Sequence, residues 1–191
     1  MARSKSEDKR NAILSAATQV FAERGLGAPT TAISQAAGVA EGTLFTYFPT
    51  KDELINALYR DIKLELADAM MSNFPRRAGI RNRFQHVWDR YVIWGVTNPA
   101  QQKVLQQMMV WGGLSEESRL AGITPFLEIE KTAEAAVAQR LFLDRPLDFI
   151  RATMSALADT TMEFMRHHPD QAEQYRQDGF EMLWSAATRK K

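Results

Sequence analysis

Helical periodicity is the sequence feature that most constrains the fold of this chain. Apolar residues recur every three or four positions along almost its entire length, as they do at Ile13, Ala17 and Phe21. This spacing places side chains on one face of an α-helix, whereas a half-buried strand needs a period of two. No segment of useful length alternates in that way. The sequence therefore predicts an all-α fold and argues against a sheet.

Glycines, prolines and capping residues divide the periodic pattern into helices. Gly25 stands where a helix ends in a left-handed residue, and Thr30 or Thr31 can cap the helix that follows. Thr50 and Glu53 form a T-x-x-E capping box before another long apolar stripe. The nine predicted helices span about 6–24, 30–37, 41–47, 51–72, 80–98, 99–111, 126–142, 147–167 and 170–188, with a short helical turn near 115–122.

Composition excludes several classes of protein. With 191 residues, 45% of them hydrophobic and 25% charged, the chain is typical of globular protein and is large enough for one large or two small domains. It has no cysteine and only three histidines, so neither a cofactor nor a metal site is predicted. No uncharged stretch reaches the roughly 20 apolar residues of a membrane helix. We expect a cytoplasmic protein without a signal peptide.

Residues 30–54, TTAISQAAGVAEGTLFTYFPTKDEL, predict two short helices joined by a glycine turn. The expected inward faces are Ile33, Ala36 and Ala37 on the first helix and Leu44 and Phe48 on the second. In a helix-turn-helix, the second helix is held outward and enters the DNA major groove. The net charge of +1 gives no support by itself, so the case rests on the motif. The expected base-facing residues are Gly42, Thr43, Thr46 and Tyr47, and the expected phosphate contacts come from Thr30, Thr31 and Lys51.

This stretch resembles the TetR family of bacterial transcriptional regulators, whose signature has the form T-x-x-I-(small)-x-x-A-G-V-x-x-G-(T/A)-(L/I)-(Y/F)-x-(Y/H)-F-x-(S/N/T)-K-(D/E)-x-L. The resemblance covers roughly the first 60 residues. It implies a DNA-binding domain at 1–50 and a ligand-binding and dimerisation domain at 51–191, with a connecting helix at about 51–72. The DNA-facing positions that it implies are Thr31, Gly42, Thr43, Phe45, Thr46, Tyr47 and Lys51.

Three residues depart from the commonest family pattern. Ser34 stands where alanine is usual, which is harmless, and Phe45 lacks the hydroxyl that a tyrosine often offers to phosphate. Glu41 replaces a frequent lysine or arginine and places an acid near DNA, although an acid also suits the positive end of a helix. These departures bear on operator preference rather than on DNA binding.

Basic residues cluster at the start of the chain and leave two interpretations open. They form either an arm that reaches DNA or the solvated start of the first helix, where Glu7 and Asp8 are interspersed. The residues concerned are Arg3, Lys5, Lys9 and Arg10.

The last two predicted helices are apolar over more than one face. A helix with one solvent-exposed side needs only about a 100° apolar stripe. The greater breadth predicts that both helices are buried against their own bundle and against a second subunit. The alternative is that both are central core helices. In the family these helices form a four-helix dimer interface. The candidate interface residues are Ile150, Met154, Leu157, Thr161, Tyr175, Met182, Leu183 and Ala186.

Aromatic and methionine side chains between residues 88 and 126 suit a plastic apolar pocket. The alternative is that they are ordinary core residues. The candidate lining residues are Trp88, Tyr91, Trp94, Met108, Met109, Trp111 and Phe126, with Gln106, Gln107, His86 or Glu128 available to orient a ligand.

These patterns predict a ligand-responsive transcriptional regulator rather than an enzyme. The sequence has neither an H-E-x-x-H motif nor a glycine-rich phosphate loop after a strand. We expect a homodimer that binds double-stranded DNA at a palindromic operator and that a small, largely apolar effector releases. Repression is the usual arrangement in the family. The alternative is a helical small-molecule-binding or interaction protein without DNA-binding activity.

Overall fold

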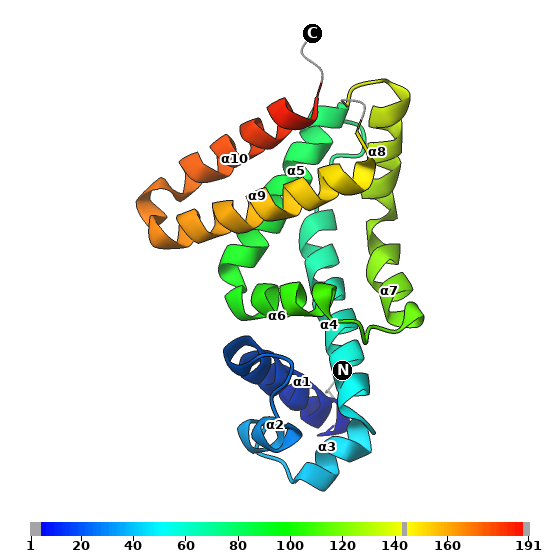
Figure 1. Ribbon diagram of the computed structural model, residues 1–191, viewed down its shortest axis with the longest axis vertical. Coiled ribbons are helices and arrows are strands. Elements are labelled where there is room, and N and C mark those ends of the chain that lie inside the picture. Colours follow the sequence, from blue (N-terminus) through cyan, green and yellow to red (C-terminus); the bar gives the residue numbers. More distant parts are fainter. Residues whose placement is uncertain (1–4, 143–144, 189–191) are drawn as a thin grey trace. The chain divides into compact units, whose positions relative to one another are not determined.

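The computed structural model describes residues 5–142 and 145–188, and these residues form helices without a β-sheet (Figure 1). This confirms the all-α prediction. The α-helices are α1 (Lys5–Arg24), α2 (Thr30–Ala36), α3 (Glu41–Tyr47), α4 (Lys51–Met71), α5 (Ile80–Thr97), α6 (Pro99–Val110), α7 (Glu116–Ile123), α8 (Leu127–Ala138), α9 (Leu147–His167) and α10 (Ala172–Ala187). Two short 3-10 helices, η1 (Thr124–Phe126) and η2 (Pro169–Gln171), precede α8 and α10.

The observed boundaries follow the sequence pattern except around α7 and α8. The expected turn near 115–122 is a helix, α7, whose first turn is capped by the Ser115 hydroxyl accepting the Ser118 N–H at 3.1 Å. Helix α8 ends four residues before the predicted Phe142. It ends there because Arg140 adopts a left-handed φ of 54° and the Leu141 N–H bonds to the Ala136 carbonyl. Apolar periodicity does not detect a left-handed residue that is not glycine.

The described residues form two compact units. The first comprises residues up to 65 together with 98–124, and the second comprises 66–97 and the residues from 125 onward. Helices α6 and α7 therefore pack with α1–α3 and the first part of α4. The expected functional boundary near residue 50 stays a prediction, because compactness reports packing and not function.

The first unit is held together by an apolar core and by buried amides. Phe21, Ile33 and Leu54 are among its fully buried side chains. The Asn56 side chain donates to the Gly113 carbonyl and accepts the Ser115 N–H, at 3.1 and 2.9 Å, which ties α4 to the loop before α7. Because each buried polar atom is paired, these bonds fix the loop without an unsatisfied group.

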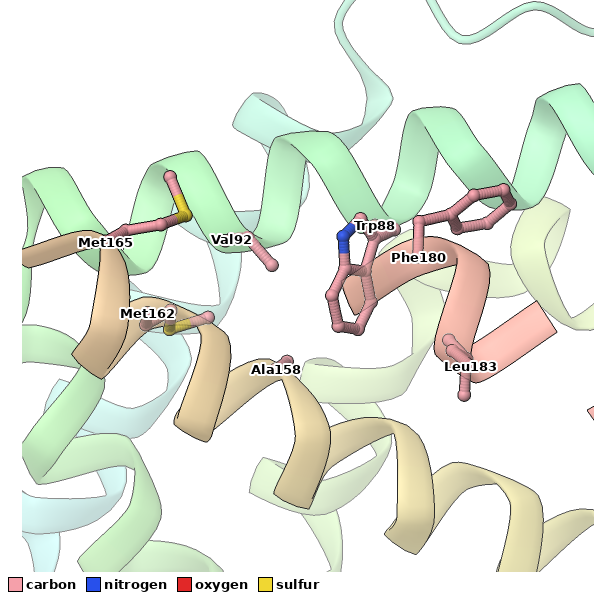
Figure 2. Close-up of a cluster of buried hydrophobic side chains, with 7 residues drawn as sticks. All are labelled: Trp88, Val92, Ala158, Met162, Met165, Phe180 and Leu183. Atoms are coloured by element: carbon pink, nitrogen blue, oxygen red, sulfur yellow. The ribbon is translucent and has the colours of Figure 1, made fainter. Parts of the chain in front are cut away.

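The second unit is built around α5, α9 and α10. Figure 2 shows the Trp88 ring among Val92, Ala158, Met162 and Phe180, all of them buried. The indole N–H of Trp88 donates to the Arg176 carbonyl at 2.8 Å, which satisfies its only polar group. No helix in the described part of the chain is both long enough and apolar enough to cross a lipid bilayer.

Thr50 caps α4, as the capping-box pattern predicts. Its hydroxyl accepts the Glu53 N–H at 3.1 Å. We expect Thr50→Ala to lower the free energy of unfolding by about 1 kcal/mol, because one amide at the helix start loses its partner. Thr50→Ser keeps the hydroxyl and should remain close to the wild-type value. Urea unfolding measures both, and equal losses for the two variants would contradict a capping role.

Candidate nucleic-acid interface

The turn between α2 and α3 has the geometry of a glycine-terminated helix end. Gly38 adopts a φ of 67°, a left-handed conformation that a side chain disfavours. Its N–H bonds to the Gln35 carbonyl at 3.1 Å, and the Val39 N–H bonds to the Ser34 carbonyl at 3.0 Å. This pair of bonds is the Schellman motif. The predicted glycine turn between the two short helices is therefore confirmed at Gly38, and the turn redirects the chain into α3.

Buried side chains fix α3 to the first unit. Leu44 is 0% exposed and Phe48 is 4% exposed, as the sequence pattern predicts. In α2, Ile33 is buried as expected, but Ala36 is exposed and Ser34 is buried in its place. Because α2 packs against both α1 and α3, its buried side is turned toward residues 33 and 34. The buried Ser34 hydroxyl donates to the Thr31 carbonyl, so its burial leaves no unpaired group.

The residues opposite Leu44 form the accessible face of α3. Gly42, Phe45 and Thr46 are exposed, while Thr43 and Tyr47 are half-buried. The Thr46 hydroxyl donates to the Gly42 carbonyl at 2.9 Å, so its hydrogen is already used within the helix. The residues that the sequence assigned to base edges thus lie on one short helix, away from its buried side.

The two threonines at the start of α2 do not cap it. Pro29 occupies the cap position in an extended conformation, and no side chain accepts a bond from the first turn. The capping prediction for Thr30 or Thr31 is therefore wrong, because Pro29 occupies the cap position and both threonines lie in the first turn of the helix. The Thr30 hydroxyl instead donates to Glu41 Oε1 at 2.9 Å, and Thr31 is exposed.

Two cations beside the motif rest on aromatic rings. The Lys51 ammonium lies 6.0 Å from the centre of the Phe21 ring, and the Arg10 guanidinium lies 5.7 Å from that of Phe48. Such contacts limit the freedom of a long side chain while its charge stays available. Lys51 is the first residue of α4 and lies beside the motif, where its charge is available to a phosphate group. In the basic N-terminal group, Arg3 lies outside the described residues, whereas Lys5, Lys9 and Arg10 belong to α1.

One contact at the end of α3 was missed by sequence reasoning. The Tyr47 hydroxyl lies 3.2 Å from Ser6 Oγ, so the end of α3 is joined to the start of α1. The two residues are 41 positions apart, and no local pattern predicts their pairing. The contact restricts the Tyr47 ring and leaves its hydroxyl one more hydrogen-bonding direction.

Residues 13–58, which run from α1 into α4, match the family model described as bacterial regulatory proteins, tetR family. The helix-turn-helix segment of the chain therefore matches that of the tetR family. Similar solved structures include a tetR family transcription regulator from Shewanella sp. PV-4, with 26% identity, a TM-score of 0.83 and coverage of 95% of this chain and 99% of that one. Another, from Marinobacter aquaeolei VT8, has 17% identity, a TM-score of 0.84 and coverage of 96% and 97%. The fold is that of a DNA-binding transcription regulator.

A more distant tetR-like structure was solved with a small molecule. The regulator LfrR from Mycobacterium smegmatis, in complex with proflavine, has 20% identity and a TM-score of 0.66, with coverage of 96% of this chain and 99% of that one. At this identity the likeness shows the fold alone.

The candidate pocket residues lie in different surroundings. Met108, Met109 and Trp111 belong to the first unit, and Trp88, Tyr91, Trp94 and Phe126 belong to the second. Trp88, Trp94, Met108 and Phe126 are buried, Tyr91 and Trp111 are half-buried, and Met109 is exposed. Burial, reinforced by the negative charge of Asp159 and partly offset by a hydrogen bond from Ser155, raises the pKa of Tyr91 to about 12. Tyr91 therefore stays neutral and retains a phenolic proton to donate.

Most of the polar side chains considered for ligand orientation already have partners. Gln107 donates to the Phe21 carbonyl at 3.2 Å, and His86 Nε2 lies 3.0 Å from the Met70 carbonyl. Glu128 pairs with Arg76 and Lys131. These three residues therefore have structural contacts that a ligand would have to displace.

The candidate interface residues on α9 and α10 are divided between core and surface. Thr161 and Leu183 are buried, while Ile150, Met154, Leu157 and Tyr175 are half-buried against the two core clusters of the second unit. Met182 and Ala186 are exposed. A second stripe of α9 is also exposed and contains large apolar side chains at both ends. Its members are Phe149, Ala152, Thr153, Ala156, Thr160 and Phe164.

Proposed function

We propose that the protein is a transcriptional repressor that binds a palindromic operator as a homodimer and dissociates when a small, largely apolar effector binds. One observation carries the DNA-binding part of this proposal: the buried Leu44 and Phe48 hold α3 so that Gly42, Phe45 and Thr46 remain accessible. A short helix presented in this way fits the major groove. The functional division into residues 1–50 and 51–191 belongs to the same proposal.

The exposed faces of α9 and α10 support the dimer. Phe149 and Phe164 are 56% and 45% exposed, and Met182 is 61% exposed, although side chains of this type are usually buried. Small residues, Ala152 and Ala156, stand between the two phenylalanines on α9 and permit close approach of a second helix. A twofold axis through this surface would bury the same patch on both subunits. We therefore refine the proposed interface to the exposed residues of α9 together with Met182 and Ala186.

Dimerisation supplies the selectivity that one short helix lacks. Two copies of α3 related by a twofold axis read two half-sites whose centres lie one or more helical turns apart. Release of DNA by the effector needs only a modest coupling between the two binding sites. A 100-fold change in the affinity for DNA corresponds to about 2.7 kcal/mol. Helix α4 contributes residues to both compact units and provides a continuous path for that coupling.

Within the first unit, the half-buried ring of Trp111 and the exposed Met109 are the proposed effector contacts that are accessible without rearrangement. The complex of LfrR with proflavine shows that this fold accommodates a small organic molecule in one relative. A thermal-shift screen of apolar compounds, followed by an operator-release assay, tests this part. A compound that raises the melting temperature and releases DNA supports it, and stabilisation without release contradicts the proposed coupling.

Selection from a random-sequence duplex pool tests the DNA-binding proposal as a whole. We expect the wild-type chain to enrich an inverted repeat, which follows from the twofold symmetry of the dimer. Enrichment of no sequence would contradict operator binding and would favour the alternative of a helical small-molecule-binding protein that does not bind DNA.

A further inference from the structure

Glu41 is the first residue of α3 and carries an exposed carboxylate on the helix that the proposed function directs at DNA. An acid at such a site is costly unless it has a specific role, because DNA carries one negative charge per roughly 1.7 Å of its axis. Phosphate groups repel the carboxylate and cannot be its partners. A hydrogen-bond donor on a base edge is the partner that the duplex offers.

Thr30 holds this carboxylate in place. The Thr30 hydroxyl donates to Glu41 Oε1 at 2.9 Å and thereby joins the start of α2 to the start of α3. A long acidic side chain on a surface normally samples several rotamers, and this bond limits them. Oε2 remains as a second acceptor, since an ionised carboxylate only accepts hydrogen bonds.

The major groove narrows the choice of base. Guanine presents acceptors at N7 and O6, and thymine presents an acceptor at O4, so both repel a carboxylate. Cytosine presents its N4 amino group as a donor, and acidic side chains are its usual partners. Adenine presents a donor beside the N7 acceptor, a pattern that suits the amide of asparagine or glutamine better than a carboxylate.

We propose that Glu41 determines specificity by accepting a hydrogen bond from the N4 amino group of a cytosine in each half-site, with Thr30 as its positioning residue. Phe45 lies four residues further along α3, on the same side as Glu41, and its 40% exposed ring suits the methyl group of a neighbouring thymine. The inference rests on the proposed function, because it requires α3 to occupy the major groove.

Parallel selections from one random duplex pool test the role of Glu41. The wild type should enrich a cytosine at one symmetric position of each half-site. E41Q should lose at least about five-fold in preference for that cytosine and shift toward adenine, since an amide both donates and accepts. The control E23Q removes an equal charge from an exposed residue of α1 and should retain the wild-type motif.

The outcomes separate this inference from the proposed function. An inverted repeat that E41Q enriches unchanged would overturn the role of Glu41 and leave operator binding intact. If the wild type enriches no motif, the proposed function fails and the inference fails with it. A uniform gain in affinity of E41Q for all duplexes, with the base preference unchanged, would show only relief of charge repulsion and would also overturn the inference.

Thr30 variants test the positioning role separately. Thr30→Val removes the hydroxyl at nearly constant volume and should reduce the cytosine preference. Thr30→Ser keeps the hydroxyl and should retain the wild-type preference. The readout is the preference at one base position, which a purely structural role would not move. If Thr30→Val weakens binding to all sequences equally, Thr30 does not position Glu41.

Discussion

Replacing Met182 with arginine should convert the dimer into a folded monomer and weaken operator binding at least about 30-fold. Met182 is exposed on α10 within a surface that we assign to the dimer, so the folded subunit tolerates a longer polar side chain there. In the dimer, each arginine would carry its charge into the apolar surface of the other subunit, and burial of a charge there is strongly unfavourable. Loss of one half-site removes about half of the specific binding free energy, or roughly 2 kcal/mol for a 1,000-fold specificity.

Met109 provides a matched control for this prediction. It is 65% exposed on α6, and Met109→Arg introduces the same side chain outside the proposed interface. Sedimentation velocity should show a monomer for Met182→Arg and a dimer for Met109→Arg, with wild-type circular dichroism for both. A dimeric Met182→Arg protein, or a monomeric wild type, would contradict the proposed interface.

Replacing Tyr47 with alanine should weaken operator binding at least about 10-fold and change binding to random duplexes little. The reason is that a residue that reads base edges contributes only at the correct sequence, at about 1–3 kcal/mol. Lys51→Ala should instead weaken binding to both DNAs equally and reduce the slope of affinity against salt by about one, since a phosphate contact carries no sequence information. Fluorescence anisotropy on operator and random duplexes, across a range of salt, measures both effects.

Tyr47→Phe separates the ring from the hydroxyl in the same assay. It keeps the half-buried ring and removes only the group that lies 3.2 Å from Ser6. An operator affinity close to that of the wild type would assign the contribution of Tyr47 to its ring. Equal losses of Tyr47→Ala on operator and random DNA would refute a base-reading role for the residue.

The sequence predicted the parts of the fold that depend on local chemistry. Gly25 and Gly38 adopt the left-handed conformations that their positions after helical stripes indicate, and Thr50 caps α4. Leu44 and Phe48 are buried because an amphipathic helix has only one apolar side to bury. Each of these features depends on residues that are close to one another in the sequence.

The features that the sequence did not predict depend on contacts between distant residues. The Thr30–Glu41 bond crosses from one helix to the next, and the contact of Ser6 with Tyr47 joins residues 41 positions apart. Thr161 and Leu183 share the apolar pattern of an interface, yet the packing of α9 against α10 places both inside the subunit. Periodicity predicts that a residue is buried, but it does not identify the helix or the subunit that buries it.

Methylation protection on the enriched duplex tests the central claim, that α3 occupies the major groove twice in each complex. Dimethyl sulfate modifies guanine N7 in the major groove and adenine N3 in the minor groove, so the two grooves are read separately. We predict two groups of protected guanines, related by a twofold axis and centred about 10 base pairs or a multiple of that distance apart, with adenine N3 unchanged. Protection of adenine N3 alone, or no protection at saturating protein, would contradict the account.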